Sequence, residues 1–279
     1  MYNKIDLKNK LESIHRKSYP AYKSLRGSYT FGDFVLSIDH VQGDPFAAPS
    51  SLHVELPLKK AGFPEKYLEK RHTKTALEDL ILRSFSKALD QYSFKAKGSG
   101  KSGLISTSRP GPEVMRRTAV EFNNIALVVR FEVGFPANGR TINAQELEKI
   151  LLEFLPEIVK TCLFYRSWEK AKIQTCYELA ENQQRIREVL EERKLVAFCA
   201  NGSILPRKSG VSSQPLKGAI EFQSPESMEI SIDLPFGNSI RGMGIPEGVT
   251  LIIGGGYHGK STLLQALEQG VYNHIKGDG

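Results

Sequence analysis

The sequence is poor in cysteine and tryptophan, with three cysteines and one tryptophan in 279 residues. The cysteines, Cys162, Cys176 and Cys199, form no C-x-x-C pair and have no histidine at the spacing of a metal-ligand motif. These features exclude a disulfide framework and give no support to a zinc or redox centre. We expect reduced, buried thiols, as in a cytosolic protein.

Long apolar runs are also missing. No segment approaches the roughly 18 consecutive apolar residues that a membrane-spanning helix needs. Residues 1–20 have an amphipathic helical pattern with many charges, and they lack the continuous apolar segment of a signal peptide. The sequence therefore predicts a soluble, cytoplasmic protein without a membrane partner.

The remaining composition is that of an ordinary globular protein, with 40% hydrophobic and 25% charged residues. The length favours about two domains. The net charge of +7 is a mild basic excess. Such an excess is compatible with an anionic partner, either a nucleotide or a nucleic acid, but does not require one.

Segments with alternating or β-branched apolar residues predict strands in both halves of the chain. The predicted strands are 34–38, 52–56, 114–122, 125–133, 195–199, 203–207, 228–234 and 249–253. Asn123-Asn124 and Asn201-Gly202 each separate two of these strands, and both pairs are typical of tight hairpin turns. Each turn therefore predicts a hairpin.

Helical spacing of apolar residues predicts helices between these strands. One covers 75–92, and another begins at Asn143 and Glu146, which have the spacing of a capping box. Pro156 is expected to kink or divide that helix. Residues 157–193 are predicted to form one long connecting helix, or two. With the strands, these elements indicate an α/β protein.

The most specific motif lies near residue 260. Gly254, Gly259, Lys260 and Ser261 satisfy the P-loop pattern G-x-x-x-x-G-K-[ST]. At average residue usage, a chain of this length would match by chance on the order of 1% of the time. The predicted strand 249–253 precedes the motif, and a helix with Leu263, Leu264 and Leu267 on its inner face is expected to follow. This order predicts a phosphate-binding loop.

The chemistry of such a loop assigns a role to each position. Glycines let successive backbone N–H groups surround a phosphate, above the positive end of the following helix. Lys260 should reach the β- and γ-phosphates of ATP, and the Ser261 hydroxyl should ligate Mg²⁺. His258 is expected to contribute its backbone N–H, with a side-chain role in phosphate chemistry as the alternative. The predicted ATP-binding residues are Gly254, Gly255, Gly256, Tyr257, His258, Gly259, Lys260, Ser261 and Thr262.

A second glycine-rich segment, GSGKSG at 98–103, is not a second P-loop, because Lys95 stands where the first glycine would be and a helix precedes it. It lies in a basic stretch that could contact the phosphates of RNA or DNA. The cations of this stretch are Lys95, Lys97, Lys101, Arg109, Arg116 and Arg117. With a second basic loop at 206–217, the stretch 95–117 gives an alternative function, an RNA-binding module that ATP regulates. The alternative for the first stretch is a solvated, mobile loop, because it contains few aromatic residues for base stacking.

Hydrolysis of ATP needs groups beyond a P-loop. Mg²⁺ requires a further carboxylate from a neighbouring strand, and the attacking water must be oriented. Seventeen residues follow Thr262, and they contain no strand with an acidic pair. We therefore expect the N-terminal part of a longer protein, which alone does not hydrolyse ATP. A small-molecule kinase would also need acceptor-site residues after the P-loop.

From Gly27 onward the sequence resembles the ATPases of the ABC class. The resemblance is carried by GSYTFGDFVLSIDHVQGDPFAAPS, GSGKSGLI, RFEVGFPANGR, NGSILPR and GMGIPEGVTLIIGGGYHGKSTLLQALEQGVYNHIKGDG. It implies a mixed α+β N-terminal domain over 1–165, and over 166–279 a connecting helix and the start of an ABC-type ATP-binding domain.

The resemblance also implies ligands and partners. It implies ATP and Mg²⁺, with Gly254–Thr262 as the Walker A segment and with the Walker B and signature segments beyond Gly279. ABC-type cores hold ATP between two copies, so a homodimer is implied for the full-length form. Phe236 is the candidate for the aromatic residue that stacks on adenine upstream of Walker A.

Overall fold

The structure, a computed structural model, describes residues 2–279. It divides into two compact units. Unit 1 contains the chain up to Glu69 together with Glu78–Arg109 and Arg116–Lys170. Unit 2 contains Lys70–Leu77, Pro110–Met115 and Ala171–Gly279.

Unit 1 is built on a seven-stranded sheet with the strand order β1-β2-β3-β4-β8-β5, in which β7 also pairs with β8. Its strands are β1 (Tyr2–Asn3), β2 (Gly27–Thr30), β3 (Val35–His40), β4 (Ser50–Pro57), β5 (Ile105–Ser106), β7 (Val120–Phe122) and β8 (Ala126–Val133). Pairing is antiparallel except between β1 and β2. Alternate residues of β4 are buried, so one face of the sheet forms the core.

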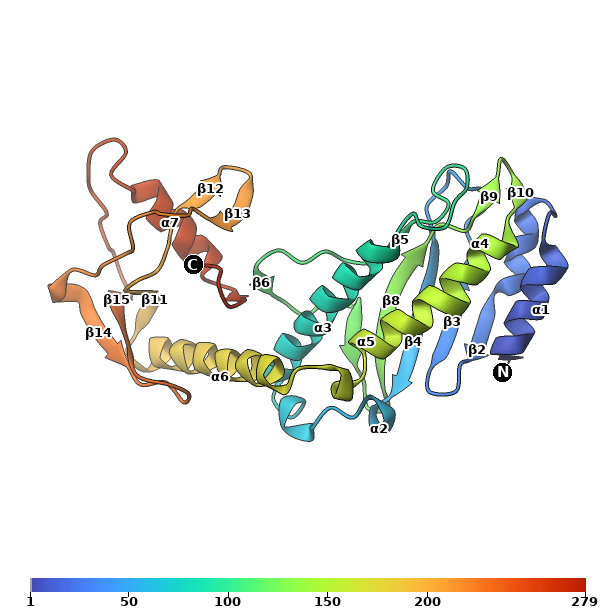
Figure 1. The fold of residues 1–279 in the computed structure, drawn as a ribbon. Helices are drawn as coiled ribbons and strands as arrows, with labels where there is room; N and C mark the ends of the chain where they lie inside the picture. The colour runs from blue at the N-terminus through green and yellow to red at the C-terminus, as the bar shows by residue number, and fades with distance from the viewer. Residues whose placement is uncertain (1) are drawn as a thin grey trace. The chain divides into compact units, whose positions relative to one another are not determined.

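Helices lie against one face of this sheet (Figure 1). They are α1 (Lys4–Ile14), α3 (Arg71–Tyr92, whose first residues belong to unit 2), α4 (Ala144–Glu148), a π-helical turn (Lys149–Phe154) and α5 (Leu155–Cys162). Shorter elements of this unit are α2 (Leu58–Ala61), the hairpin of β9 (Ala137–Asn138) and β10 (Thr141–Ile142), and 3₁₀ turns at Tyr19–Leu25, Glu65–Tyr67 and Tyr165–Ser167. Buried side chains of α1, such as Leu7 and Leu11, face this core.

Several predicted boundaries are confirmed in unit 1. The Asn123 side chain accepts hydrogen bonds from the Ile125 and Ala126 amides in the turn between β7 and β8. The Asn143 side chain caps α4 by accepting the Glu146 amide. Pro156 lies in the first turn of α5, directly after the π-helical turn. Proline has no N–H and its ring crowds the carbonyl one turn earlier, which explains a break in the regular helix at this point.

Unit 2 contains α6 (Lys170–Glu192, whose first residue belongs to unit 1) and an antiparallel sheet in the order β11-β15-β14. Its further elements are β6 (Glu113–Val114), β11 (Leu195–Ala200), β12 (Arg207–Ser209), β13 (Ser212–Pro215), a 3₁₀ turn at Glu226–Met228, β14 (Glu229–Ile232), β15 (Ile240–Pro246), α7 (Lys260–Gln269) and β16 (Asn273–His274). A small core forms around Cys199, Met243 and Ile245. Leu263 and Leu267 of α7 pack against it, which fixes the helix that follows the glycine-rich loop.

Some predictions for unit 2 are wrong. Residues 195–199 form β11, but β11 pairs with β15 and not with 203–207, so Asn201-Gly202 is a turn without a hairpin. The basic segment 206–217, predicted as a loop, contains the hairpin of β12 and β13. Leu264 is 55% exposed and does not share the inner face with Leu263 and Leu267.

The segment 249–253 is not a strand in this structure. Val249, Leu251 and Ile253 are each at least 80% exposed. Strand propensity reflects packing against neighbouring strands more than an intrinsic backbone preference, and no strand pairs with this segment among the described residues. The α/β class itself is confirmed, because both units combine helices with sheets.

Candidate functional site

The glycine-rich loop 254–259 leads directly into α7. Helix α7 begins at Lys260, and Gly259 precedes it with a left-handed φ of 80°. Tyr257 also has a positive φ, 61°, which is uncommon for a residue with a side chain. These two positions place left-handed residues in the loop directly before the helix.

The Lys260 side chain lies along this loop. Its ammonium donates hydrogen bonds to the carbonyl oxygen of Gly254 at 2.6 Å and to that of Gly255. A positive charge is therefore held between the start of the loop and the positive end of α7. An anion at this position would meet the ammonium and the unpaired N–H groups of the first helical turn.

The His258 ring also folds onto the loop. Its Nδ1 atom accepts the backbone N–H of Gly255, with 3.2 Å between the two nitrogens. A Cβ atom placed on Gly255 would lie 3.1 Å from Cε1 of the ring, so a side chain at 255 would crowd the imidazole. The sequence motif identifies this residue, but its side-chain contact cannot be predicted from spacing.

Ser261 and Thr262 occupy the first turn of α7. Ser261 is exposed, so its hydroxyl is open to an ion held by phosphate oxygens. Among residues 2–279 no group of three or more His, Cys, Asp or Glu side chains could hold a metal ion. An exposed hydroxyl at this position suits a Mg²⁺ ion that is held mainly by phosphate oxygens.

The six cationic side chains of the basic stretch differ in their contacts. Three of them make ion pairs: Arg109 with Asp90 at 2.5 Å, Arg116 with Glu121 at 3.2 Å, and Arg117 with Asp79 at 2.6 Å. Asp79 is buried, and burial raises the pKa of its carboxyl although Arg83 and Arg117 oppose the shift. The pair between Arg117 and Asp79 is thus part of the packed structure.

The three lysines of that stretch are exposed. The Lys95 ammonium lies 4.6 Å from the centre of the Tyr92 ring, and the Lys97 ammonium donates to the Phe94 carbonyl at 3.1 Å. Lys101 belongs to the segment 98–103, whose backbone and serine side chains are hydrogen-bonded to residues 134–139 at several points. A Cβ atom on Gly134 would lie 1.8 Å from the Lys101 carbonyl oxygen. This segment is a closely packed turn with an exposed lysine.

The contacts of Phe236 in this structure are with α6 and not with the P-loop. Its ring packs edge-on against Tyr177 of α6, with 5.8 Å between the ring centres. Its backbone N–H and carbonyl both pair with the Asn182 side chain, also on α6. Figure 1 draws the connection between β14 and β15 beside α6, apart from the loop that precedes α7. A role in stacking on adenine stays a prediction.

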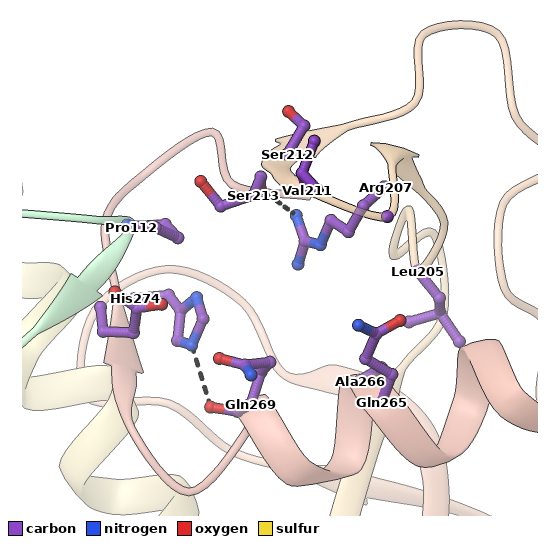
Figure 2. A pocket seen from close by; sticks show the side chains of 12 residues that line it. Pro112, Leu205, Arg207, Val211, Ser212, Ser213, Gln265, Ala266, Gln269 and His274 are labelled. Carbon is purple, nitrogen blue, oxygen red and sulfur yellow. Dashed lines mark hydrogen bonds between the residues drawn. The ribbon is translucent and has the colours of Figure 1, made fainter.

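A pocket of about 240 Å³ lies beside the C-terminal half of α7 (Figure 2). Arg207 and His274 face it, and both bind the Asp278 carboxylate, at 3.1 Å and 2.5 Å respectively. His274 also contacts the Gln269 carbonyl at 3.0 Å. The sequence does not indicate this cluster, because Arg207 is 71 residues from Asp278 along the chain. Its polar groups bind one another and tie the end of the described chain to α7.

The cysteines are free thiols; Cys162 and Cys199 are buried as expected, whereas Cys176 is only half-buried. Burial raises the pKa of Cys199 to about 11 and also raises that of Cys162, which disfavours the reactive thiolate at both positions. No helix among residues 2–279 has the length and hydropathy to cross a bilayer.

Comparison with known proteins places these features in a family. Residues 4–166 match the model of the N-terminal part of ATPases of the ABC class, and residues 169–279 match that of the ABC ATPase P-loop domain. A protein of Methanocaldococcus jannaschii, named as uncharacterized, is 38% identical over 106 residues, which are 35% of this chain. The chain covers 24% of the length of that relative. A P-loop domain supports nucleotide binding, in agreement with the geometry around Lys260. Since the two models together match nearly all of its residues, the chain belongs to the ATPases of the ABC class.

Proposed function

We propose that this chain binds Mg-ATP through residues 254–262. The observation that carries the proposal is the position of the Lys260 ammonium, which lies against the Gly254 and Gly255 carbonyls at the start of α7. The ammonium, the loop amides and the helix N-terminus together form a positive environment that suits a polyphosphate.

Each group has a separate part in the proposed binding. The backbone N–H groups of 255–260 donate to the β-phosphate, and Lys260 turns from the loop carbonyls toward the β- and γ-phosphate oxygens. The Ser261 hydroxyl ligates Mg²⁺, which is shared with the phosphates. Mg²⁺ supplies charge neutralisation for the phosphates when it is bound.

Hydrolysis is proposed for a protein longer than these 279 residues. The chain covers 24% of the relative in Methanocaldococcus jannaschii, which leaves room for further catalytic segments. Residues 2–279 contain no group of three or more His, Cys, Asp or Glu side chains that could hold a metal ion. We propose that the Walker B and signature segments lie elsewhere in the whole protein, that two copies enclose ATP, and that the protein acts in the cytoplasm. We also propose a domain boundary near residue 165.

Calorimetry with Mg-ATP tests the binding proposal on the folded chain. Lys260→Ala removes the ammonium that should contact two phosphates, and we expect its affinity to fall by at least about tenfold, because charge-assisted hydrogen bonds of about 1.5–3 kcal/mol are removed. Lys276→Ala is the matched control, because Lys276 is an exposed lysine of the same unit. Equal affinities of the Lys260 variant and the wild type would refute the proposal.

Nucleic-acid binding is a second candidate function, favoured by two aromatic rings that lie beside the exposed lysines. Phe46 is 61% and Phe94 is 53% exposed. A Cβ atom on Gly100 would lie 2.9 Å from the Phe46 ring, so this ring borders the turn that carries Lys101. Exposed rings next to cations are the combination that binds single-stranded RNA or DNA. Lys208 and Lys217 in the 206–217 segment are also exposed.

Salt-dependent binding of a single-stranded oligonucleotide tests this candidate. Changing both Lys97 and Lys101 to glutamate should weaken binding and reduce the slope of log K against log salt by about 0.7 for each phosphate that the variant no longer neutralises. Lys87→Glu is the control, an exposed lysine of α3 outside the basic stretch. Binding that does not depend on salt, or that responds equally to all these variants, would contradict this second function.

A further inference from the structure

The turn that follows α3 contains an aromatic residue with a left-handed backbone. Phe94 lies two residues after the end of α3 and has a φ of 61°. This conformation is unfavourable for a residue with a Cβ atom. The backbone holds it in place, because the Phe94 N–H donates to the Gly103 carbonyl at 2.7 Å. Glycine or asparagine usually occupies such a position after a helix, so the geometry of the turn does not require a phenyl ring.

The Phe94 ring also gains little from burial. Phe94 is 53% exposed, whereas Ala96 in the same turn is 1% exposed and packs into the core. The hydrogen bond to Gly103 uses only the backbone, so other residues could make it equally well. A strained backbone and an exposed apolar ring therefore occur at one residue, and both lower stability. Strained residues of this kind are concentrated at binding sites.

The surroundings of Phe94 are cationic. The Lys97 ammonium donates to the Phe94 carbonyl at 3.1 Å, and Lys101 is exposed on the turn that ends at Gly103. A nearby carboxylate, that of Glu146, already accepts the Lys97 backbone N–H at 2.8 Å and is paired with a lysine of the following turn. The charges next to the exposed ring are thus complementary to a chain of phosphates.

We propose that Phe94 is a base-stacking residue for a single-stranded nucleic acid, present at this position for binding although it lowers stability. The inference rests on the second candidate function, nucleic-acid binding, and assigns to it a residue that contacts the bases. The aromatic face stacks on an unpaired base while the lysines contact phosphates of the same strand. Bases within a duplex are already stacked and paired, so the partner is an unpaired strand.

Binding of three labelled strands to Phe94→Gly tests the inference on the full chain. The strands are an oligoadenylate as DNA, the same sequence as RNA, and a deoxyribose-phosphate strand of equal length that lacks bases. Glycine removes the ring and adopts a left-handed φ without strain. We expect the affinity for both oligoadenylates to fall by about 5- to 150-fold, which is the range for stacking on one base. The affinity for the strand without bases should not change, because every phosphate contact remains.

Two further measurements separate stacking from a purely structural role. Phe94→Tyr is the matched variant, because it keeps the aromatic face, and it should bind both oligoadenylates with nearly the affinity of the wild type. Thermal unfolding then compares Phe94→Gly with the wild type. Because glycine relieves the backbone strain, Phe94→Gly should unfold at a temperature no lower than that of the wild type.

The outcomes distinguish the inference from the function on which it rests. If the wild type binds the oligoadenylates and Phe94→Gly binds them equally well, stacking is refuted while binding through the lysines stands. An equal loss of affinity for the strand without bases, or a lower unfolding temperature of Phe94→Gly, would also overturn the inference, because the ring would then serve the fold. If the wild type binds none of the strands, nucleic-acid binding fails and the inference fails with it.

Discussion

At the scale of single residues, Gly242 shows how a glycine can determine strand pairing. It lies in β15 opposite Ala200 of β11. A Cβ atom at this position would lie 2.2 Å from the Cys199 carbonyl oxygen, which belongs to the backbone and cannot turn away. The sheet of unit 2 therefore depends on the absence of a side chain at residue 242.

This close approach predicts the effect of a single methyl group. Gly242→Ala should lower the free energy of unfolding by about 1–3 kcal/mol, because the added atom forces β11 and β15 apart. Gly210→Ala is the matched control in the same unit, since a Cβ there would meet nothing within 4 Å. Urea denaturation followed by circular dichroism measures both variants. Equal stabilities of the two variants would show that the close approach of the strands is not needed.

At the scale of elements, the sequence predicts the regular segments better than their partners. Helices α3 and α4 and strands β3, β4 and β8 have clear apolar periodicity, and they lie where that periodicity indicates. Strand β15 is not predicted from the sequence, because IRGMGIP has glycines where a strand normally has packed side chains. Without it, the pattern pairs β11 with the wrong segment.

The candidate site shows the same division between local pattern and tertiary contact. The motif locates the loop at 254–259 and the start of α7, because both depend on residue types at fixed spacing. The contacts of His258 and Lys260 with the loop backbone depend on dihedral angles that spacing does not specify. Likewise, the ion pairs of Arg109, Arg116 and Arg117 join residues whose proximity follows from the fold.

At the scale of the whole molecule, the two compact units follow the two family models only in part, because Lys70–Leu77 and Pro110–Met115 belong to unit 2 and lie within the first model. The first model ends at residue 166 and the second begins at 169, close to the division of the structure at Lys170. Unit 2 carries the P-loop, and unit 1 carries the exposed lysines beside Phe46 and Phe94. Membership of the ABC class explains the P-loop in unit 2. Nucleic-acid binding by the exposed lysines of unit 1 is a separate proposal.

Hydrogen exchange measured with and without Mg-ATP tests the central claim most directly, because it reports on the backbone amides that should hold the phosphates. We predict slower exchange in a peptide covering 254–262 when Mg-ATP is present, and no change in a peptide covering the glycine-rich turn 98–103. Unchanged exchange at 254–262 under saturating Mg-ATP, or protection at 98–103 in its place, would contradict the account.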